Sequence, residues 1–390
     1  SSRYYSNRPV RDSPIGDACQ EHEMKDLQAL REKLSSLDVE LLEMVARRQE
    51  IVAEIGRVKS SAGRGTRDYA REKDVLNLAR QTARRVGVDE DIGEEMFRLL
   101  IRASLAAQEL DKVTSERTGS GKRALVVGGA GQMGQWFVRF LDAQGYSIEL
   151  CDPKPAASGH PRFATLDDTD LAHDLIVLAT PIRESVSLLE QLTSRKPTGV
   201  VFDISSLKGP LAGSLQNLVT AGCLVTSIHP MFGPDTELLS GRNVVFVDLG
   251  VPEATATVRE LFNSTMAEQV SMSLDGHDHA MAYVLGLSHA VNIAFFNALS
   301  QSGEEAEELA KLSSSTFDAQ MDVASRVAEE NPYLYFEIQS LNTHSPRALV
   351  TLLNAVTQVA GRVLDGDEKG FVELMAQGKA FLARRPEDRP

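Results

Sequence analysis

The stretch Val126–Phe137, "VVGGAGQMGQWF", decides the fold of the larger part of this chain. A strand-like apolar run leads into Gly129, Gly131 and Gly134, and a helical pattern follows. Glycines at this spacing permit a tight turn and let the backbone approach a pyrophosphate, whose charge meets the N-terminus of the helix. The stretch therefore predicts a dinucleotide-binding turn, with a glycine turn in some other α/β fold as the alternative.

Asp152 supports the first interpretation, because it ends the next apolar run, "SIELCD", 23 positions after Gly129 (152 − 129). A carboxylate in this place accepts hydrogen bonds from the ribose hydroxyls and repels a 2′-phosphate, so we expect NAD rather than NADP. We also assign Gln132, Met133 and Thr180 to cofactor binding.

The sequence around this turn alternates short apolar runs with helical stretches. The runs are "RALVVGG", "SIELCD", "DLIVLATP", "GVVFDIS", "CLVTSIHP" and "RNVVFVDLG". Such alternation is typical of a doubly wound parallel sheet, which we predict for residues 122–274. Residues 275–383 lack strand patterns and contain long apolar helices, so we expect an all-α C-terminal domain there.

Composition excludes several classes of protein. The chain has 390 residues, of which 42% are hydrophobic and 25% charged, as in ordinary globular proteins. A net charge of −14 argues against a nucleic-acid partner. No apolar run approaches the ~20 residues of a membrane span, and three scattered cysteines form neither a disulfide framework nor a metal site. We expect a cytoplasmic enzyme that acts on small molecules.

The region before the turn is helical. Residues 1–23 lack periodicity and are predicted to be a flexible tail. Leucine, valine and isoleucine recur at three- and four-residue steps through residues 24–110, which predicts an all-α domain. Residues 111–121 are mostly polar, contain two glycines and are predicted to be a linker.

Cations interrupt the apolar stripe of the first helix. Arg48 and Lys59 lie within about 20° of each other and about 16 Å apart along an ideal helix, so they can converge on one ligand. Arg31 lies about 25 Å from Arg48 and roughly 100° around the helix, and reaches that ligand more easily from an antiparallel partner helix. Buried cations need a counter-charge. The counter-charge is either an anionic ligand or an internal carboxylate such as Asp38 or Glu72.

A charged cluster on the second helix favours a ligand. Asp68, Arg71 and Glu72 share one helical face, and Gln108 continues the pattern on the third helix. Together with "LQALREKLSSLDVELLEMVARRQEIVAEIGRVK", "RDYAREKDVL" and "RASLAAQEL", this set resembles the all-helical chorismate mutases. The resemblance implies carboxylate binding by Arg31, Arg48 and Arg71, contact with the ether oxygen by Lys59 and Gln108, and contact with the ring hydroxyl by Asp68 and Glu72.

The same resemblance implies an intertwined helical homodimer in which Arg31 acts across the subunit boundary. It also implies the rearrangement of chorismate to prephenate, which requires no proton transfer.

Further motifs follow the glycine turn. "DISSLKGP" places Ser206 and Lys208 just past a strand, where ligands of α/β sheets collect, and "SIHPMFGPD" places His229 at the end of another. "GHDHAMAYVLGLSHAVN" carries His289, and "DVASRVAEENP" carries Arg326. The alternatives are a loop cap for His229 and a solvated helix residue for Arg326. His277 and His279 lack a third ligand of suitable spacing, so no metal is predicted.

In this order the motifs resemble those of the prephenate dehydrogenases. The resemblance implies that His229 accepts the proton of the ring hydroxyl, that Ser206 holds His229 and the hydroxyl, that Arg326 grips a carboxylate and that His289 lines the pocket. It implies hydride transfer to the nicotinamide and loss of carbon dioxide to give 4-hydroxyphenylpyruvate. The two halves together predict a bifunctional, homodimeric enzyme of tyrosine biosynthesis.

Two positions depart from the enteric bifunctional enzymes. Ser288 and Asp318 stand where those enzymes carry arginines, which removes positive charge near an anionic substrate. An alternative is therefore an enzyme pair for the 4-amino-4-deoxy analogues, in which Asp318 meets an ammonium. A binding protein with a degenerate enzyme fold is the alternative of another class.

Overall fold

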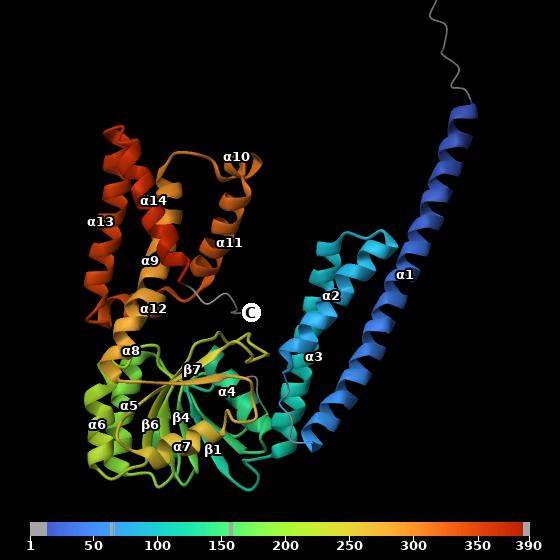
Figure 1. The fold of residues 1–390 in the computed structure, drawn as a ribbon. Helices are drawn as coiled ribbons and strands as arrows, with labels where there is room; N and C mark the ends of the chain where they lie inside the picture. Colours follow the sequence, from blue (N-terminus) through green and yellow to red (C-terminus); the bar gives the residue numbers. More distant parts are fainter. Residues whose placement is uncertain (1–13, 63–64, 66, 156–158, 385–390) are drawn as a thin grey trace, which may run out of the picture. The chain divides into compact units, whose positions relative to one another are not determined.

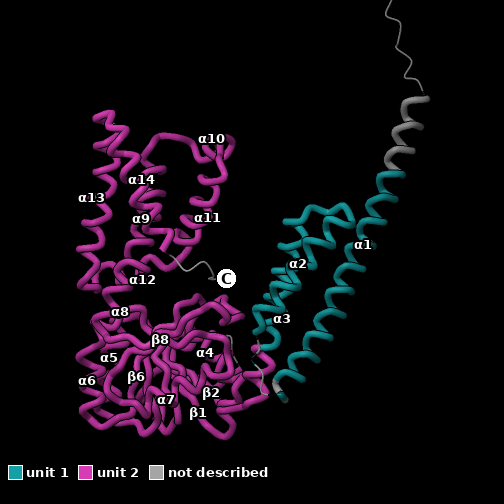
Figure 2. The backbone as a smooth tube through the Cα atoms, in the orientation of Figure 1, with its two compact units in different colours: residues 1–108 teal, residues 109–390 magenta. Residues whose placement is uncertain are grey.

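The computed structural model describes residues 14–62, 65, 67–155 and 159–384. The chain forms two compact units, residues 1–108 and 109–390 (Figure 2). The first unit corresponds to the predicted helical domain. The second holds the glycine turn and everything after it (Figure 1).

The first unit is made of α1 (Pro14–Ser61), α2 (Tyr69–Val86) and most of α3 (Glu90–Glu116). Asp68 caps the N-terminus of α2, and Gly87 ends that helix in the left-handed conformation, with a φ of 81°. Leucines of the α1 stripe remain exposed within one chain; Leu30 and Leu34 are 60% and 59% exposed.

Two predicted boundaries were wrong. Helix α1 already begins at Pro14, inside the predicted tail 1–23, while residues 1–13 lie outside the described residues. Helix α3 continues to Glu116, through the first half of the predicted linker 111–121. This half is helical because it has a buried face: Val113 is 3% exposed, and the carboxylate of Glu109, one turn earlier in the same unit, accepts the N–H of Leu239.

The second unit is built on one eight-stranded sheet with the order β3-β2-β1-β4-β5-β6-β7-β8. Its strands are β1 (Arg123–Val127), β2 (Ser147–Cys151), β3 (Arg162–Phe163), β4 (Leu175–Leu178), β5 (Val200–Asp203), β6 (Val225–Pro230), β7 (Asn243–Val247) and β8 (Glu268–Met272). Only the β6–β7 pair is antiparallel. The predicted doubly wound sheet is confirmed, with the short β3 and the half-exposed β8 missed because neither has a strong apolar run.

Helices cover both faces of this sheet. They are α4 (Gln132–Ala143), α5 (Ile182–Arg195), α6 (Ala212–Thr220) and α7 (Pro252–Glu260), with 3-10 turns at Leu166–Asp168 and Gly209–Leu211. Phe137 of α4 and Val258 of α7 belong to one buried cluster, and Leu189 of α5 and Leu215 of α6 belong to another. The two clusters form the core on opposite faces, as expected for alternating β and α segments.

The C-terminal part is helical, as predicted. It consists of α8 (Leu274–Met281), a π-helical segment (Ala282–Leu287), α9 (Ser288–Gln301), α10 (Ala306–Lys311), α11 (Ser315–Glu329), α12 (Pro332–Leu341), α13 (Ser345–Leu364) and α14 (Glu368–Leu382). One continuous helical stretch, Leu274–Gln301, is by length and composition long and apolar enough to cross a membrane. The expectation that no apolar run approaches the length of a membrane span was therefore wrong. Length and composition alone do not distinguish a membrane span from an apolar helix that packs against protein.

Candidate active sites

In the first unit, Arg48 reaches from α1 to α3. Its guanidinium donates to the Ser104 hydroxyl at 2.7 Å and to the Leu100 carbonyl at 3.3 Å. Partial burial lowers the pKa of this guanidinium. No carboxylate pairs with it in the described part of the chain, so Arg48 retains its charge for an anion.

The sequence reasoning missed Ser104. This residue is buried and lies four positions before Gln108, so both side chains share one face of α3. The Gln108 amide donates to the Val52 carbonyl at 3.0 Å. A Cβ on Gly56 would come within 3.0 Å of the Gln108 side chain, so this glycine leaves room for it against α1. The i, i+4 spacing was the available signal for Ser104.

The start of α2 holds the other predicted mutase residues. Asp68 accepts the backbone N–H of Arg71 at 3.0 Å, which gives it a capping role. Glu72 accepts two N–H groups of Arg67, at 2.9 and 3.0 Å, and is not the counter-charge of Arg48. Arg67 also lies over the Tyr69 ring at 4.3 Å.

The remaining predicted cations of the first unit differ in exposure. Lys59 is half-buried on α1, whereas Arg31 and Arg71 are exposed. The structure therefore brings Arg48 and Gln108 together at the contact of α1 and α3, with Lys59 on the same helix as Arg48. It leaves Arg31 open to solvent within one chain.

In the second unit, the glycine turn joins β1 to α4. Gly128, the residue before the three assigned glycines begin, has the left-handed conformation, with a φ of 81°. A Cβ on Gly134 would lie 2.1 Å from the Gly128 carbonyl oxygen, so the helix can approach the turn only with glycine there. Gly131 precedes α4 without a side-chain cap, which leaves N–H groups for a phosphate.

Asp152 lies against this turn. Its carboxylate accepts the N–H of Ala130 at 3.0 Å and the N–H of Lys154 at 2.8 Å. The side chain is thereby fixed beside the turn.

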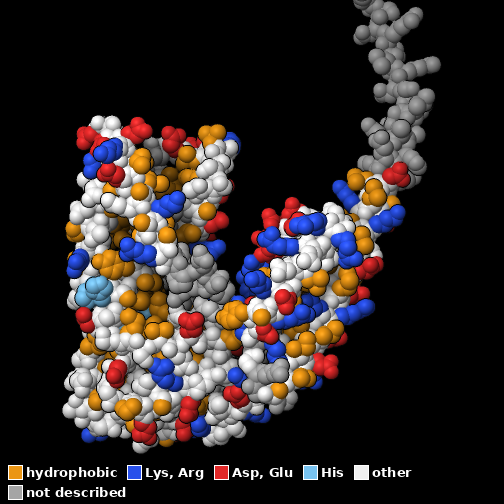
Figure 3. Space-filling view, viewed as in Figure 1, with side chains coloured by type: hydrophobic (Ala, Val, Ile, Leu, Met, Phe, Trp, Pro, Cys, Tyr) orange, Lys and Arg blue, Asp and Glu red, His pale blue; other side chains and the backbone are white. Residues whose placement is uncertain are grey.

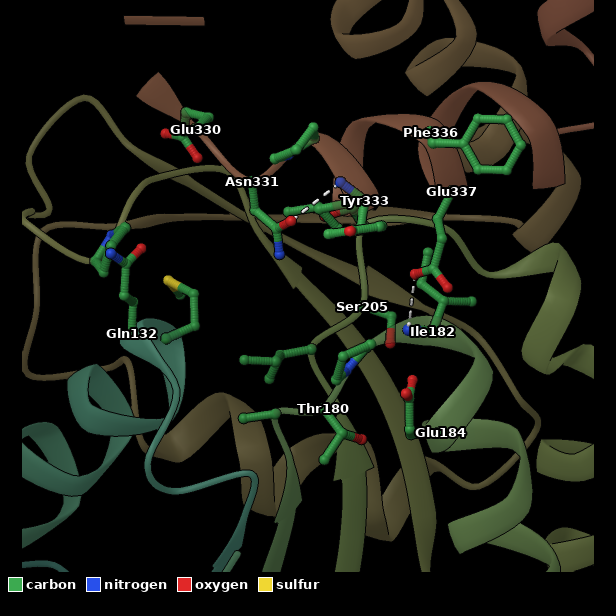
Figure 4. A pocket seen from close by; sticks show the side chains of 18 of the residues that line it. Gln132, Thr180, Ile182, Glu184, Ser205, Glu330, Asn331, Tyr333, Phe336 and Glu337 are labelled. Carbon is green, nitrogen blue, oxygen red and sulfur yellow. Dashed lines mark hydrogen bonds between the residues drawn. The ribbon is translucent and has the colours of Figure 1, made fainter. Parts of the chain in front are cut away.

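A cleft of about 1390 Å³ opens at the carboxyl ends of β1, β4 and β5 (Figure 4). It is lined by five predicted site residues: Gln132, Met133, Thr180, Ser206 and Arg326. Residues of α12, among them Tyr333 and Phe336, form its other wall. This is the edge of a doubly wound sheet at which ligands bind.

His229 is the penultimate residue of β6 and belongs to a series of buried, hydrogen-bonded groups. Its Nδ1 lies 2.9 Å from His277 Nε2, and His277 Nδ1 lies 2.8 Å from Asp278 Oδ1. A carboxylate only accepts, so His277 Nδ1 carries a proton, its Nε2 accepts, and His229 Nδ1 donates. His229 Nε2 is then unprotonated, as a general base requires.

Electrostatics supports this assignment. Burial, followed by the neighbouring His277 and Lys208, lowers the pKa of His229 well below its ordinary value, so the ring is neutral. Burial raises the pKa of Asp278, but hydrogen bonds from His277 and from the N–H groups of Lys208 and Gly209 outweigh it and keep Asp278 ionised. From the sequence, His277 was considered only as a candidate metal ligand.

The prediction for Lys208 was wrong. Its ammonium is fully buried and donates to Asp203 Oδ2 at 2.6 Å and to the Ile228 carbonyl at 2.7 Å. Burial lowers the pKa of Lys208 while the Asp203 carboxylate opposes that shift. Lys208 therefore joins β5 to β6 and does not line the cleft of the second unit described above.

Ser206 and His289 lack some of the contacts that the sequence analysis predicted for them. Ser206 lines the cleft, but in the described part of the chain its hydroxyl makes no hydrogen bond with His229. His289 stacks on Tyr335 with ring centroids 4.1 Å apart, and its buried Nδ1 has no hydrogen-bond partner among the described residues. His229 and His289 are both absent from the cleft lining.

Three segments of the chain match known families. Residues 30–109 match the family described as chorismate mutase type II. Residues 157–270 match the nucleotide-binding domain of prephenate dehydrogenase, and residues 273–377 match its dimerization domain.

Two curated relatives span nearly the whole chain. The T-protein of Enterobacter agglomerans is 29% identical over 350 residues, which is 89% of this chain and 90% of the relative. The T-protein of Haemophilus influenzae is 27% identical over 352 residues, 90% of each protein.

A solved structure shows the same fold. Prephenate dehydrogenase from A. aeolicus, in complex with hydroxyphenyl propionate and NAD+, has a TM-score of 0.57 and 20% identity, and covers 68% of this chain and 99% of its own. With the three matched domains in this order, the chain belongs to the family that joins a type II chorismate mutase to an NAD-dependent prephenate dehydrogenase.

Proposed function

We propose that this chain catalyses two consecutive steps of tyrosine biosynthesis. Residues 24–110 rearrange chorismate to prephenate, and residues 122–383 oxidise and decarboxylate prephenate to 4-hydroxyphenylpyruvate with NAD. The observation that carries the second step is the hydrogen-bonded series His229–His277–Asp278, which leaves a neutral imidazole nitrogen available as a base.

The mutase step depends on charge and shape. Arg48 and Arg71, with Arg31 of a second subunit, hold the two carboxylates of chorismate in a folded conformation. Lys59 and Gln108 donate to the ether oxygen, whose negative charge grows as its bond to carbon breaks. Donors of this kind contribute about 3–4 kcal/mol in other enzymes. Ser104, bonded to Arg48, orients the guanidinium.

The dehydrogenase step needs a base. His229 Nε2 takes the proton of the ring hydroxyl, His277 and Asp278 keep the ring in the required tautomer, and Ser206 holds the hydroxyl. NAD supplies the acceptor for the hydride that leaves the carbinol carbon. Arg326 binds a carboxylate of the substrate. Loss of the ring carboxylate as carbon dioxide then restores aromaticity.

Exposed apolar surface supports a homodimer. Hydrophobic side chains lie at the surface of both units (Figure 3). They include the leucines of the α1 stripe and, on α13, Leu353, Val356 and Val363, which are exposed within one chain. The apolar stretch Leu274–Gln301 falls within the segment matched to a dimerization domain, so we assign its exposed face to a subunit contact. We place this homodimer in the cytoplasm.

The 4-amino-4-deoxy alternative is not favoured. Ser288 bonds to the Val284 carbonyl of its own helix, and Asp318 accepts from Ser313, so neither departure reaches into the cleft. Relative rates on prephenate and on its 4-amino analogue measure this preference directly.

The test is an incubation of the protein with chorismate and NAD. We expect NADH and 4-hydroxyphenylpyruvate to form together. A folded protein that yields neither contradicts the proposal, and a faster reaction with the amino analogues favours the alternative.

A further inference from the structure

The cleft of the second unit has two walls from distant parts of the chain. One wall holds Thr180, at the end of β4, and the first turn of α5 (Figure 4). The other holds Arg326, near the end of α11, and the residues of α12. The spacing of the walls therefore sets the distance between the cofactor loops and the cation that binds the substrate.

Glu337 connects these walls. From α12, its Oε2 accepts the backbone N–H of Ile182 at 3.3 Å, drawn as a dashed line in Figure 4. Its Oε1 lies 3.6 Å from Nε of Arg183. The Glu337 side chain is 12% exposed, so its charge is largely removed from water.

The first turn of α5 explains why a carboxylate occupies this position. Pro181 precedes the helix and provides no side-chain cap. The N–H groups of a first helical turn lack partners within the helix, and the helix dipole favours a negative charge there. Glu337 supplies this cap from the opposite wall, and Arg183 adds a positive charge.

Among the described residues, no other carboxylate of the cleft makes a comparable link between the two walls. Glu330 lies on the short connection between Arg326 and α12, lines the same cleft and is exposed. Its negative charge opposes the binding of a dianion. If charge alone decided affinity, removal of Glu330 and removal of Glu337 would have the same effect.

We propose that Glu337 is a positioning residue of the dehydrogenase, an inference that rests on the proposed function of the cleft. By tying α12 to α5, it holds Arg326 at the distance from Thr180 that prephenate requires. Glu337 acts through Arg326 and does not contact the substrate.

The test compares Glu337→Ala with the matched control Glu330→Ala, since each removes one negative charge from the same cleft. We expect Glu337→Ala to raise the KM for prephenate about 10-fold, because small displacements of a binding group are costly. We expect its kcat to change less than about 3-fold and Glu330→Ala to lower KM or leave it unchanged. Glu337→Gln, whose amide oxygen still accepts from Ile182, falls between wild type and Glu337→Ala.

Two further measurements separate positioning from misfolding. Mutase activity of the same chains should be unchanged. Hydrogen exchange in a peptide covering residues 180–184 should accelerate in Glu337→Ala and not in Glu330→Ala. This readout needs no turnover, so it tests the link even if wild-type protein fails to oxidise prephenate, which would refute the proposed function instead. Equal shifts of KM in the two variants, or unchanged exchange in Glu337→Ala, would overturn the inference.

Discussion

The two units differ in how much of their predicted functional surface is buried within one chain, and they serve different reactions. In the first unit the apolar stripe of α1 and the cation Arg31 are exposed within one chain. In the second, the sheet and the proposed base are buried; Phe137 is fully buried and His229 is 5% exposed. A pericyclic rearrangement needs only fixed charges, which two subunits can supply together. An oxidation needs a base that stays neutral, and burial within one chain provides it.

The largest effect expected from this contrast is that of His229→Asn. Removal of the base should lower dehydrogenase turnover by about 10²–10⁴-fold. Mutase turnover should remain within about 2-fold, because the rearrangement transfers no proton. Prephenate oxidation and chorismate consumption are measured on the same preparation. The control is His279→Asn, which alters an exposed histidine whose ring is tilted against that of His344. Retained oxidation would remove His229 from the mechanism.

Arg48→Ala gives the converse loss. Without this cation the mutase rate should fall on the order of 10²-fold, while oxidation of added prephenate is unchanged. Arg47→Ala is a matched control, since Arg47 is the exposed neighbour on the same helix. Equal losses in both variants would show that general charge, and not the bonded position of Arg48, is what the reaction uses.

Burial of Glu109 should make the unfolding free energy of the second unit depend on pH. Burial raises its pKa to about 7, against hydrogen bonds from the N–H groups of Leu239 and Met266 that favour the charged form. The folded protein therefore binds more protons than the unfolded chain between the ordinary carboxyl pKa and pH 7. The unfolding free energy of the second unit should fall by about 1–3 kcal/mol as pH rises through this window, and then level off.

Glu109→Gln removes this titration. Denaturant unfolding at several pH values between 4.5 and 7 should show a flatter dependence in the variant than in wild type. Parallel curves would mean that Glu109 is ionised throughout.

The smallest expected effect tests whether Gly56 keeps the Gln108 side chain in its position in the first unit. Gly56→Ala should lower mutase kcat up to about 10-fold, because the new Cβ meets Gln108 at 3.0 Å. Alanine favours the helix by about 1 kcal/mol, so a loss of activity with equal or greater thermal stability isolates the displacement of Gln108. Gly378→Ala, a helical glycine with open space around it, is the control.

Local patterns in the sequence predicted most of the fold. Alternating apolar runs predicted the sheet, and the helical periodicity predicted the first unit. The boundaries failed where tertiary contacts overrode composition: the polar residues after Asp111 are helical because Val113 and Glu109 are buried. The strand β8 contains one valine, Val270, which is exposed, and its apolar pattern was too weak to predict a strand.

The candidate sites were predictable where a motif names the residue and not where the role depends on its neighbours. Arg48, Gln108, His229 and Arg326 were assigned from motifs. The function of His277 depends on contacts with residues 48 positions earlier and one position later, which no spacing rule gives. Lys208 has the residue type of an anion ligand, but its burial against Asp203 appears only in the fold.

The central claim is that one chain holds two independent reaction sites that act in series. The most direct test uses His229→Asn and Arg48→Ala separately and then mixed, with chorismate and NAD supplied. We predict that His229→Asn accumulates prephenate, that Arg48→Ala forms little NADH from chorismate but oxidises added prephenate, and that the mixture restores NADH formation. Loss of both activities in either folded variant, or no recovery on mixing, would contradict the account.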